Sequence, residues 1–301
     1  MAPARSDRIG GIKRQSGKKA GGGLPPELVD LHRGLNRETA PRWEDFSTHR
    51  ARVTELVLRC PGQSCALLGA GNCNDVDLEA LAGRFAEVHL FDLDKEALLR
   101  ARQRLGAEVA ARVIAHEPVD LGGSLVQLRR FRNRPATAEE LGAFSAESVA
   151  QALARVPDRF DVVVSTCVLS QLVYACDRFL GPQHPQVEVL ACAVVVAHLR
   201  LLAALVKPGG RGLLLTDMVS SDTYPLDDLW GQRDPWALVE ELETAGNHLS
   251  GTTPKFTRRI VNTDPVIAPR VASSELETPW LWRISEDETY LVYGLQFARR
   301  V

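Results

Sequence analysis

Short apolar runs alternate with amphipathic stretches along most of the chain. The apolar runs are bounded by turn residues, which is typical of strands buried on both faces of a sheet, and they cover residues 64–68, 88–91, 112–114, 160–164 and 212–215. Apolar residues at helical spacing predict helices between them, over residues 75–85, 94–105, 137–155 and 187–205. Strands that alternate with helices form a mostly parallel sheet with helices on both faces. The pattern therefore predicts a doubly wound α/β fold.

The two ends of the chain depart from this alternation. Two further helical stretches precede the first strand, over residues 27–35 and 43–58. After a helix over residues 236–245, the alternating runs 280–284 and 290–297 are close enough to form an antiparallel hairpin. The predicted organisation is a disordered basic tail, an N-terminal helical segment and an α/β domain with an inserted helix near 121–157, covering residues 1–24, 25–62 and 63–301.

Composition and charge narrow the class of protein. Hydrophobic residues make up 45% of the chain and charged residues 25%, as in ordinary globular proteins. The 36 basic and 38 acidic residues give a net charge of −2, which excludes a chain that is polybasic or polyacidic as a whole. The most apolar stretch, residues 187–206, is interrupted by Glu188, His198 and Arg200 and predicts a buried helix. The basic tail is expected to be solvated, with RNA contact as the alternative.

The six cysteines give no sign of a metal centre. They form no CxxC pair, and no histidine cluster lies near them at zinc-ligand spacing. Most lie in apolar stretches, and no secretory hydrophobic segment follows the N-terminus. We therefore expect no metal, reduced thiols and a cytoplasmic location.

The segment Leu68-Gly-Ala-Gly-Asn-Cys-Asn-Asp75 connects the first strand to the next helix. Gly69 and Gly71 allow the backbone to turn sharply and to approach a ligand closely. In open parallel sheets, ligands bind beyond the carboxyl ends of the strands, where this turn lies. Asp92 ends the next strand 21 residues after Gly71 (92 − 71), where an acid can bind a ribose diol. Turn and acid together predict nucleoside binding; a turn that binds nothing is the alternative.

The turn favours S-adenosylmethionine over NAD. The dinucleotide fingerprint requires a third glycine, and Asn74 stands at that position. Asp75 adds negative charge at the start of the helix, which suits a diphosphate poorly. A cationic sulfonium ligand tolerates this charge better. An NAD-dependent oxidoreductase is the less favoured alternative.

From residue 65 to the C-terminus the sequence resembles the class I S-adenosylmethionine-dependent methyltransferase superfamily. The resemblance depends on an ordered set of motifs, LLGAG at 67–71, FDLD at 91–94, VDL at 119–121, FDVVVS at 160–165, LVKPGG at 205–210 and YLVYGLQF at 290–297. It implies a Rossmann-like, doubly wound, mostly parallel seven-stranded sheet with an antiparallel terminal strand near one edge. Two departures stand out: Leu67 replaces the family's usual acid, and Cys73 and Asn74 replace its common third glycine.

The resemblance also implies which residues bind the cofactor, S-adenosylmethionine. The ribose is expected at Asp92 and the adenine near Asp120 and Leu121. Substitute hydrogen bonds to the methionine end are expected from Asn72, Asn74 and Asp75. The complete predicted set is Gly69, Ala70, Gly71, Asn72, Asn74, Asp92, Leu93, Asp120, Leu121 and Ser165.

The implied reaction is methyl transfer to an unidentified acceptor by in-line displacement, in which the protein mainly positions the reactants. A small-molecule acceptor is favoured, with nucleic acid as the alternative and no membrane partner. Ser170, Gln171 and Tyr174 are expected beyond the fourth strand, and Tyr174 and His184 are the candidate bases. The Asn/Asp-Pro-Pro-aromatic pattern is absent there, which argues against adenine-N6 and glutamine methylation. A non-catalytic cofactor-binding module is the alternative function.

Other candidate residues have simpler interpretations. Cys167 is expected to pack, His198 to be a hydrogen-bonded core histidine and His116 to line the adenine pocket or be exposed. A basic run could guide an anionic acceptor or form a solvated loop, and consists of Arg129, Arg130, Arg132 and Arg134. Four acids could hold a divalent metal or act as caps and loop residues, namely Asp217, Asp222, Asp227 and Asp228.

Overall fold

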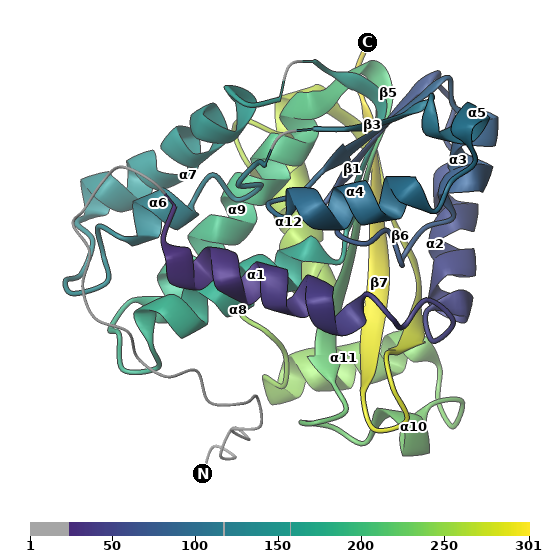
Figure 1. The fold of residues 1–301 in the computed structure, drawn as a ribbon. Helices are drawn as coiled ribbons and strands as arrows, with labels where there is room; N and C mark the ends of the chain where they lie inside the picture. The colour runs from purple at the N-terminus through teal and green to yellow at the C-terminus, as the bar shows by residue number, and fades with distance from the viewer. Residues whose placement is uncertain (1–23, 117, 157) are drawn as a thin grey trace.

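The computed structural model describes residues 24–116, 118–156 and 158–301 (Figure 1). The predicted basic tail therefore lies outside the described residues, except for Leu24. Two helices precede the sheet, α1 (Pro26–Thr39) and α2 (Ser47–Leu58). In Figure 1, α1 lies between α4 and α8, and it contacts both.

One sheet of seven strands forms the centre of the fold, in the order β3-β2-β1-β4-β5-β7-β6. Its strands are β1 (Ser64–Leu68), β2 (Glu87–Phe91), β3 (Val113–Ala115), β4 (Phe160–Thr166), β5 (Val206–Ser220), β6 (Val271–Arg283) and β7 (Thr289–Arg299). Neighbours among β1 to β5 are parallel, whereas β7 runs antiparallel to both β5 and β6. This topology confirms the predicted Rossmann-like fold, with an antiparallel terminal strand inserted near one edge.

Helices follow the strands and return the chain across the sheet. They are α3 (Leu78–Arg84), α4 (Lys95–Gln103), α5 (Ala107–Ala110), α6 (Leu125–Leu128), α7 (Ala138–Leu153), α8 (Val168–Leu180), α9 (Val187–Leu205), α10 (Leu226–Leu229), α11 (Pro235–Ala245) and α12 (Pro254–Thr263), with a 3₁₀ turn at Ala268–Arg270. Side-chain caps fix several starts, since Asp94 accepts the N–H groups of Glu96 and Ala97 at the start of α4. Thr137 and Glu140 form the predicted capping box of α7.

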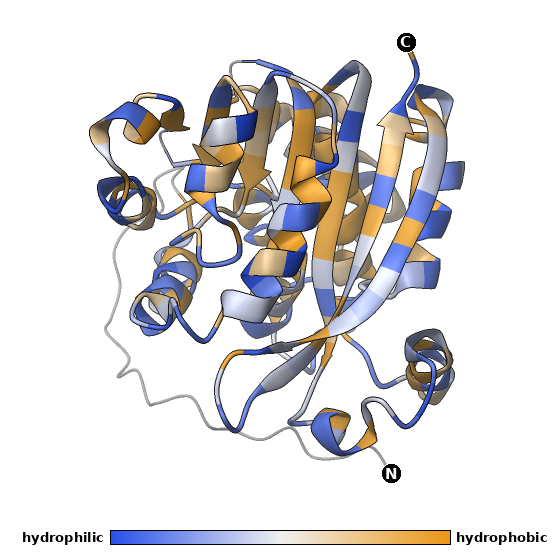
Figure 2. Cartoon of the chain, turned by 90° about the vertical axis from the view of Figure 1, so that its right-hand side faces the viewer, coloured by the Kyte–Doolittle hydropathy of each residue, from blue (hydrophilic) through white to orange (hydrophobic). Residues whose placement is uncertain are grey.

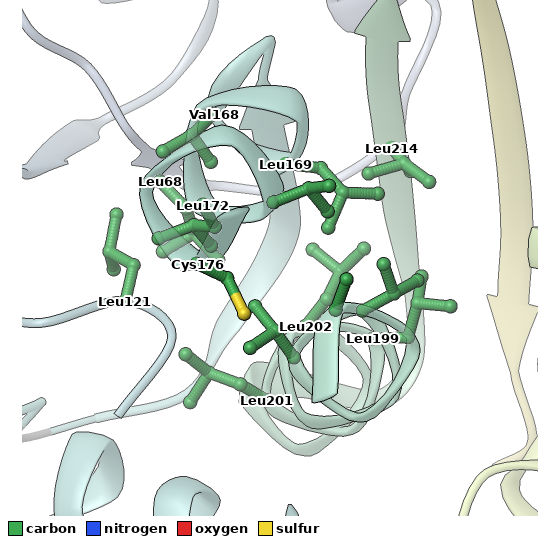
Figure 3. Packing of buried hydrophobic residues seen from close by; sticks show 14 of the residues in the cluster. Leu68, Leu121, Val168, Leu169, Leu172, Cys176, Leu199, Leu201, Leu202 and Leu214 are labelled. Carbon is green, nitrogen blue, oxygen red and sulfur yellow. The ribbon is translucent and has the colours of Figure 1, made fainter. Parts of the chain in front are cut away.

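The hydrophobic core lies in two layers, one on each face of the sheet. Successive side chains of a strand point to opposite faces, so Leu67 packs in the layer under α2 and α3, and Leu68 packs in the layer under α8 and α9. Figure 3 shows Leu68 and Leu214 facing the side chains of α8 and α9. The central strands are correspondingly apolar along most of their length, whereas the edge strand β6 carries many polar residues (Figure 2).

Helix α9 is the one helix in the described part of the chain that is long and apolar enough to cross a membrane. About 61% of its most apolar window is buried within the fold, where α9 contacts α7, α8 and the sheet. Its apolar surface is thus covered by other elements of the chain. The sequence-based prediction of a buried helix agrees with this packing.

Candidate functional site

The glycine turn follows β1 at the carboxyl edge of the sheet. Gly69 and Gly71 both have positive φ angles, 75° and 48°. A Cβ atom on Gly69 would lie 2.3 Å from Cβ of Val168, and one on Gly71 would lie 2.6 Å from Oδ1 of Asn36. Both positions therefore require glycine. The close approach to Gly71 that the sequence predicts for a ligand is made here by a side chain of α1.

Asp92 follows β2 directly, beside this turn. Its carboxylate accepts the backbone N–H of Gly71 at 2.9 Å and that of Asp94 at 2.8 Å. Burial raises the pKa of Asp92 to about 6, although these two N–H groups and Asn36 favour the ionised form. A carboxylate has about four acceptor positions, so the two N–H groups leave capacity for a ligand.

A small cavity lies between the strand ends and α1. Its volume is about 20 Å³, which is room for about one water molecule. Four of the ten predicted cofactor residues line it, namely Asp92, Leu93, Asp120 and Leu121. The other lining residues come from α1, α8 and the loop before α6, and are His32, Asn36, Val119, Leu125, Val168, Gln171 and Leu172. The predicted ribose and adenine positions thus share one cavity, with α1 over it.

Hydrogen bonds with Asp120 and His198 fix the loop at the predicted adenine position. Asp120 accepts the N–H groups of Gly122 at 3.1 Å and Leu125 at 2.9 Å, and burial raises its pKa to about 6. His198, fully buried in α9, lies 3.2 Å from the carbonyl oxygen of Leu121 through Nδ1. A carbonyl oxygen only accepts, so Nδ1 carries the proton. His198 is therefore a hydrogen-bonded core histidine.

Ser165 forms a hydrogen bond with the same histidine. The neutral ring of His198 accepts the Ser165 hydroxyl at Nε2, over 2.8 Å. Ser165 is fully buried in β4 and does not line the cavity. Its hydroxyl thus supports the loop of Asp120 and Leu121 through His198. Direct contact between Ser165 and a cofactor stays a prediction.

Asn72 and Asn74 connect the glycine turn to the end of α1. The side-chain amide of Asn72 donates to the carbonyl oxygen of Asn36 at 2.5 Å and to Oγ1 of Thr39 at 3.2 Å. That of Asn74 donates to the carbonyl oxygen of Thr39 at 2.7 Å. These amides, which the sequence assigned to the methionine end of the cofactor, here anchor α1.

Two arginines strengthen this anchor. Arg104 donates to the carbonyl oxygen of Asn72 and, at 3.3 Å, to Oδ1 of Asn74. The ring of Trp43 lies between two guanidinium groups, at 3.6 Å from Arg50 and 4.3 Å from Arg104. The connection from α1 to α2 is consequently fixed to the turn.

Neither candidate base lies at the cavity. His184 donates from Nε2 to the carbonyl oxygen of Phe131 at 2.8 Å, beyond the end of α8. Helix α8 has 13 residues, so about 20 Å separates this loop from the carboxyl end of β4, where α8 begins, and a role of His184 as a base stays a prediction. Tyr174 is half-buried on α8 and does not line the cavity.

A buried histidine that sequence analysis missed lies at the carboxyl end of β4. His49 in α2 accepts the indole N–H of Trp280 at Nδ1, over 3.1 Å. Its Nε2 therefore carries the proton, and lies 3.8 Å from Sγ of Cys167 and 3.2 Å from Oδ1 of Asp75. Cys167 has a left-handed backbone with φ of 48°, which is rare outside glycine.

His49, Asp75 and Cys167 bring three ligand atoms within 4.8 Å of one another. A metal at Nε2 would require the other tautomer of His49, which would set two protons against each other between Nδ1 and Trp280. Burial raises the pKa of the Cys167 thiol well above its usual range. The cluster is thus arranged for hydrogen bonding, and its chemistry does not fit a metal.

The charged segments singled out by the sequence are partly paired, although Asp217 forms no ion pair among the described residues. Three ion pairs engage the basic run, between Arg130 and Glu147, between Arg132 and Glu27, and between Arg134 and Glu140. After β5, Asp227 binds Arg283 and Thr289. These pairs neutralise much of the charge that could have guided an anion or held a cation.

No protein-family model and no curated protein matches the sequence. Among solved structures, the fold is similar to that of the YcgJ protein from Bacillus subtilis, at 14% identity over 83% of this chain and 99% of that chain, with a TM-score of 0.44. A TehB-like SAM-dependent methyltransferase from Corynebacterium glutamicum is 12% identical over 86% of this chain and 97% of that chain, with a TM-score of 0.39.

An O-methyltransferase family protein from Burkholderia thailandensis is 14% identical over 91% of this chain and 71% of that chain, with a TM-score of 0.40. The structural neighbours are mostly class I S-adenosylmethionine-dependent methyltransferases. At identities and TM-scores this low, the likeness describes the fold alone.

Proposed function

We propose that this chain binds S-adenosylmethionine at the carboxyl ends of β1 and β2 and transfers its methyl group to an acceptor beyond β4. The proposal depends on one observation: the buried carboxylate of Asp92 accepts the N–H of Gly71 and lines the same cavity as Asp120 and Leu121. Ligands of open parallel sheets bind at this edge.

The polar groups around the cavity suit a nucleoside. His32 in α1 is buried and lines the cavity, and its Nε2 has no hydrogen-bond partner. A ligand hydroxyl or ring nitrogen would satisfy this atom, and the free acceptor positions of Asp92 suit a ribose diol. Leu93 and Leu121 offer apolar contact to a base.

The volume requires a movement of α1. A cavity of about 20 Å³ is far too small for adenosine, and Asn36 fills the space beside Gly71. The C-terminal end of α1, including the carbonyl group of Asn36, is anchored by Asn72 and Asn74, so the turn that carries His32 and the side chain of Asn36 have to move aside. Their return would cover the ligand and exclude water from the site.

S-adenosylmethionine supplies an already activated methyl group when it is bound. The residues of the chain then have mainly positional work: Asp92 holds the ribose, the loop above His198 holds the base and α1 keeps water out. Asp92 is largely ionised at neutral pH, because a pKa of about 6 lies below it. It can therefore accept both ribose hydroxyls.

Calorimetry with S-adenosylhomocysteine tests the proposal. We expect micromolar binding, about −8 kcal/mol, and a loss of about 1–3 kcal/mol in Asp92→Asn because ribose hydroxyls lose a charged acceptor. Glu79→Gln, on the exposed side of α3, is the matched control. Failure of both S-adenosylmethionine and S-adenosylhomocysteine to bind would refute the proposal. Binding of NADH would favour an oxidoreductase, and binding without any turnover would favour a non-catalytic module.

A further inference from the structure

A second group of polar residues lies where the methyl acceptor has to meet the cofactor. We call it the acceptor-side cluster, and its members are His49, Asp75, Cys167, Ser170, Asp217 and Trp282. Cys167 follows β4 directly and precedes Val168, which lines the cofactor cavity. Asp217 lies near the carboxyl end of β5, and the hydroxyl of Ser170 in α8 donates to its carboxylate. The cluster therefore borders the cavity at the carboxyl edge.

Two carboxylates of the cluster lack a cationic side chain. Asp217 is buried and accepts the hydroxyl of Ser170 at 2.6 Å. Among the ion pairs of the described residues, Asp75 pairs only with His49, and Asp217 with none. Elsewhere the buried Asp264 is paired with Arg200 at 2.8 Å. Buried carboxylates without a counter-ion are costly, and a cationic ligand would relieve that cost.

The cluster also holds a buried donor without a partner. Nε1 of Trp282 is one of six buried side-chain nitrogen or oxygen atoms of the described residues that make no hydrogen bond. Oδ1 of Asp75, another of the six, lies 3.2 Å from Nε2 of His49. Trp282 is 7% exposed, and its ring stacks on His49 with centroids 4.4 Å apart. Its ring also contacts Tyr290 at 5.6 Å. The unpaired indole donor thus belongs to a ring that stacks on His49, and His49 also neighbours Asp75.

We propose that the methyl acceptor is an amine that carries an oxygen atom close to its nitrogen, and that the acceptor-side cluster binds it. This inference rests on the proposed function. The protonated nitrogen lies between the carboxylates of Asp75 and Asp217. The neighbouring oxygen accepts the indole N–H of Trp282. A simple alcohol carries no positive charge and would leave both carboxylates uncompensated.

The chemistry of such an acceptor uses the same carboxylates. The ammonium nitrogen first gives one proton to Asp217, whose pKa burial raises to about 6, and so recovers its lone pair. That lone pair forms the new N–C bond while the C–S bond breaks and its electron pair stays on sulfur. The products are a methylated ammonium ion, a neutral thioether and a protonated carboxyl group, so atoms and charge balance.

Matched probes test the inference by binding. The probes are 2-amino-1-phenylethanol, 1-phenylethane-1,2-diol and phenethylamine, measured by calorimetry on the full chain with and without S-adenosylhomocysteine. We expect the amino alcohol to bind at least about tenfold more tightly than the diol, the ratio typical of one charge-assisted contact. Equal binding of the two would overturn the inference.

Variants assign the contacts. Asp217→Asn and Asp75→Asn should each weaken the amino alcohol by about tenfold or more, while Asp222→Asn, in the exposed loop after β5, should not. Trp282→Phe keeps the aromatic ring but removes the N–H, so it should weaken the amino alcohol and leave phenethylamine unchanged. Asp75 is partly exposed, which makes its amide variant a second test if Asp217→Asn misfolds. Unchanged binding in both amide variants would overturn the inference.

The outcome is separable from that of the proposed function. If S-adenosylhomocysteine binds and the amino alcohol does not, the assigned acceptor is wrong while cofactor binding stands. If the amino alcohol binds without S-adenosylhomocysteine and neither adenosyl ligand binds, the cluster stands and the proposed function fails.

Discussion

Replacing His198 by glutamine tests whether the histidine beneath the adenine loop is neutral in the folded protein. Burial lowers the pKa of His198 from its usual 6.5 to about 4, while its hydrogen bond to Leu121 opposes this. A histidine whose pKa is lower in the folded than in the unfolded state makes its full contribution to stability at pH values above its unfolded pKa. That contribution is lost as pH falls from about 6.5 towards 4, because in this range the histidine is protonated in the unfolded chain but not in the folded one.

The size of the effect follows from these two values. One pKa unit corresponds to 1.36 kcal/mol, so lowering the pH from about 7.5 to about 5.0 should cost the wild type about 2 kcal/mol through His198 alone. Glutamine does not titrate, and its amide can donate to Leu121 and accept from Ser165. We therefore expect His198→Gln to be about 1–2 kcal/mol less stable near pH 7.5, and the deficit to vanish near pH 5.0.

Urea unfolding followed by circular dichroism at both pH values measures this change. The other ionisable groups are common to the two proteins and cancel in the comparison, including Asp92 and Asp120. His248→Gln, which removes a partly exposed histidine near α11, is the control for losing an imidazole. A stability difference that is the same at both pH values would refute the assignment of His198 as a neutral, doubly hydrogen-bonded group.

Two further substitutions examine the turn and its cover. Gly69→Ala should destabilise the fold by about 2–5 kcal/mol, since a Cβ would meet Val168 at 2.3 Å at a φ of 75°; a urea midpoint equal to that of the wild type would contradict the turn geometry. Asn36→Ala should speed the association of S-adenosylhomocysteine in stopped-flow measurements, because the side chain beside Gly71 is removed; slower association would mean that Asn36 holds the ligand rather than the closed state.

Much of the sheet follows from local pattern. Apolar runs such as residues 64–68 and 160–164 are buried on both faces, so their composition alone marks them as central strands. The insertion of an antiparallel terminal strand near one edge came instead from the family resemblance, since hydrophobic periodicity says nothing about which strands become neighbours. Helix α12 was missed although Thr253 followed by Pro254 is an N-terminal signal.

The candidate site was predictable only where its residues lie in strand-end motifs. Asp92 and Asp120 follow strands, and the topology brings them to one cavity. His49 and Trp280 are 231 positions apart in the sequence, and no spacing rule connects them. Asn36 was overlooked for the same reason, because its contact with Gly71 depends on how α1 packs across the sheet edge.

The unusual composition of the glycine turn has a structural explanation. The last carbonyl groups of a helix have no partner within it, and α1 ends at Thr39. Asn72 and Asn74 donate to the carbonyl oxygens of Asn36 and Thr39, which also accept the N–H groups of Ala40 and Arg42, so the turn adds a second hydrogen bond to each carbonyl at the end of α1. Glycine at position 74 would remove one of these donors. The residue that departs from the family motif thus joins the turn to the helix that covers the cavity. A ligand that approaches Gly71 has to displace the side chain of Asn36 in that helix.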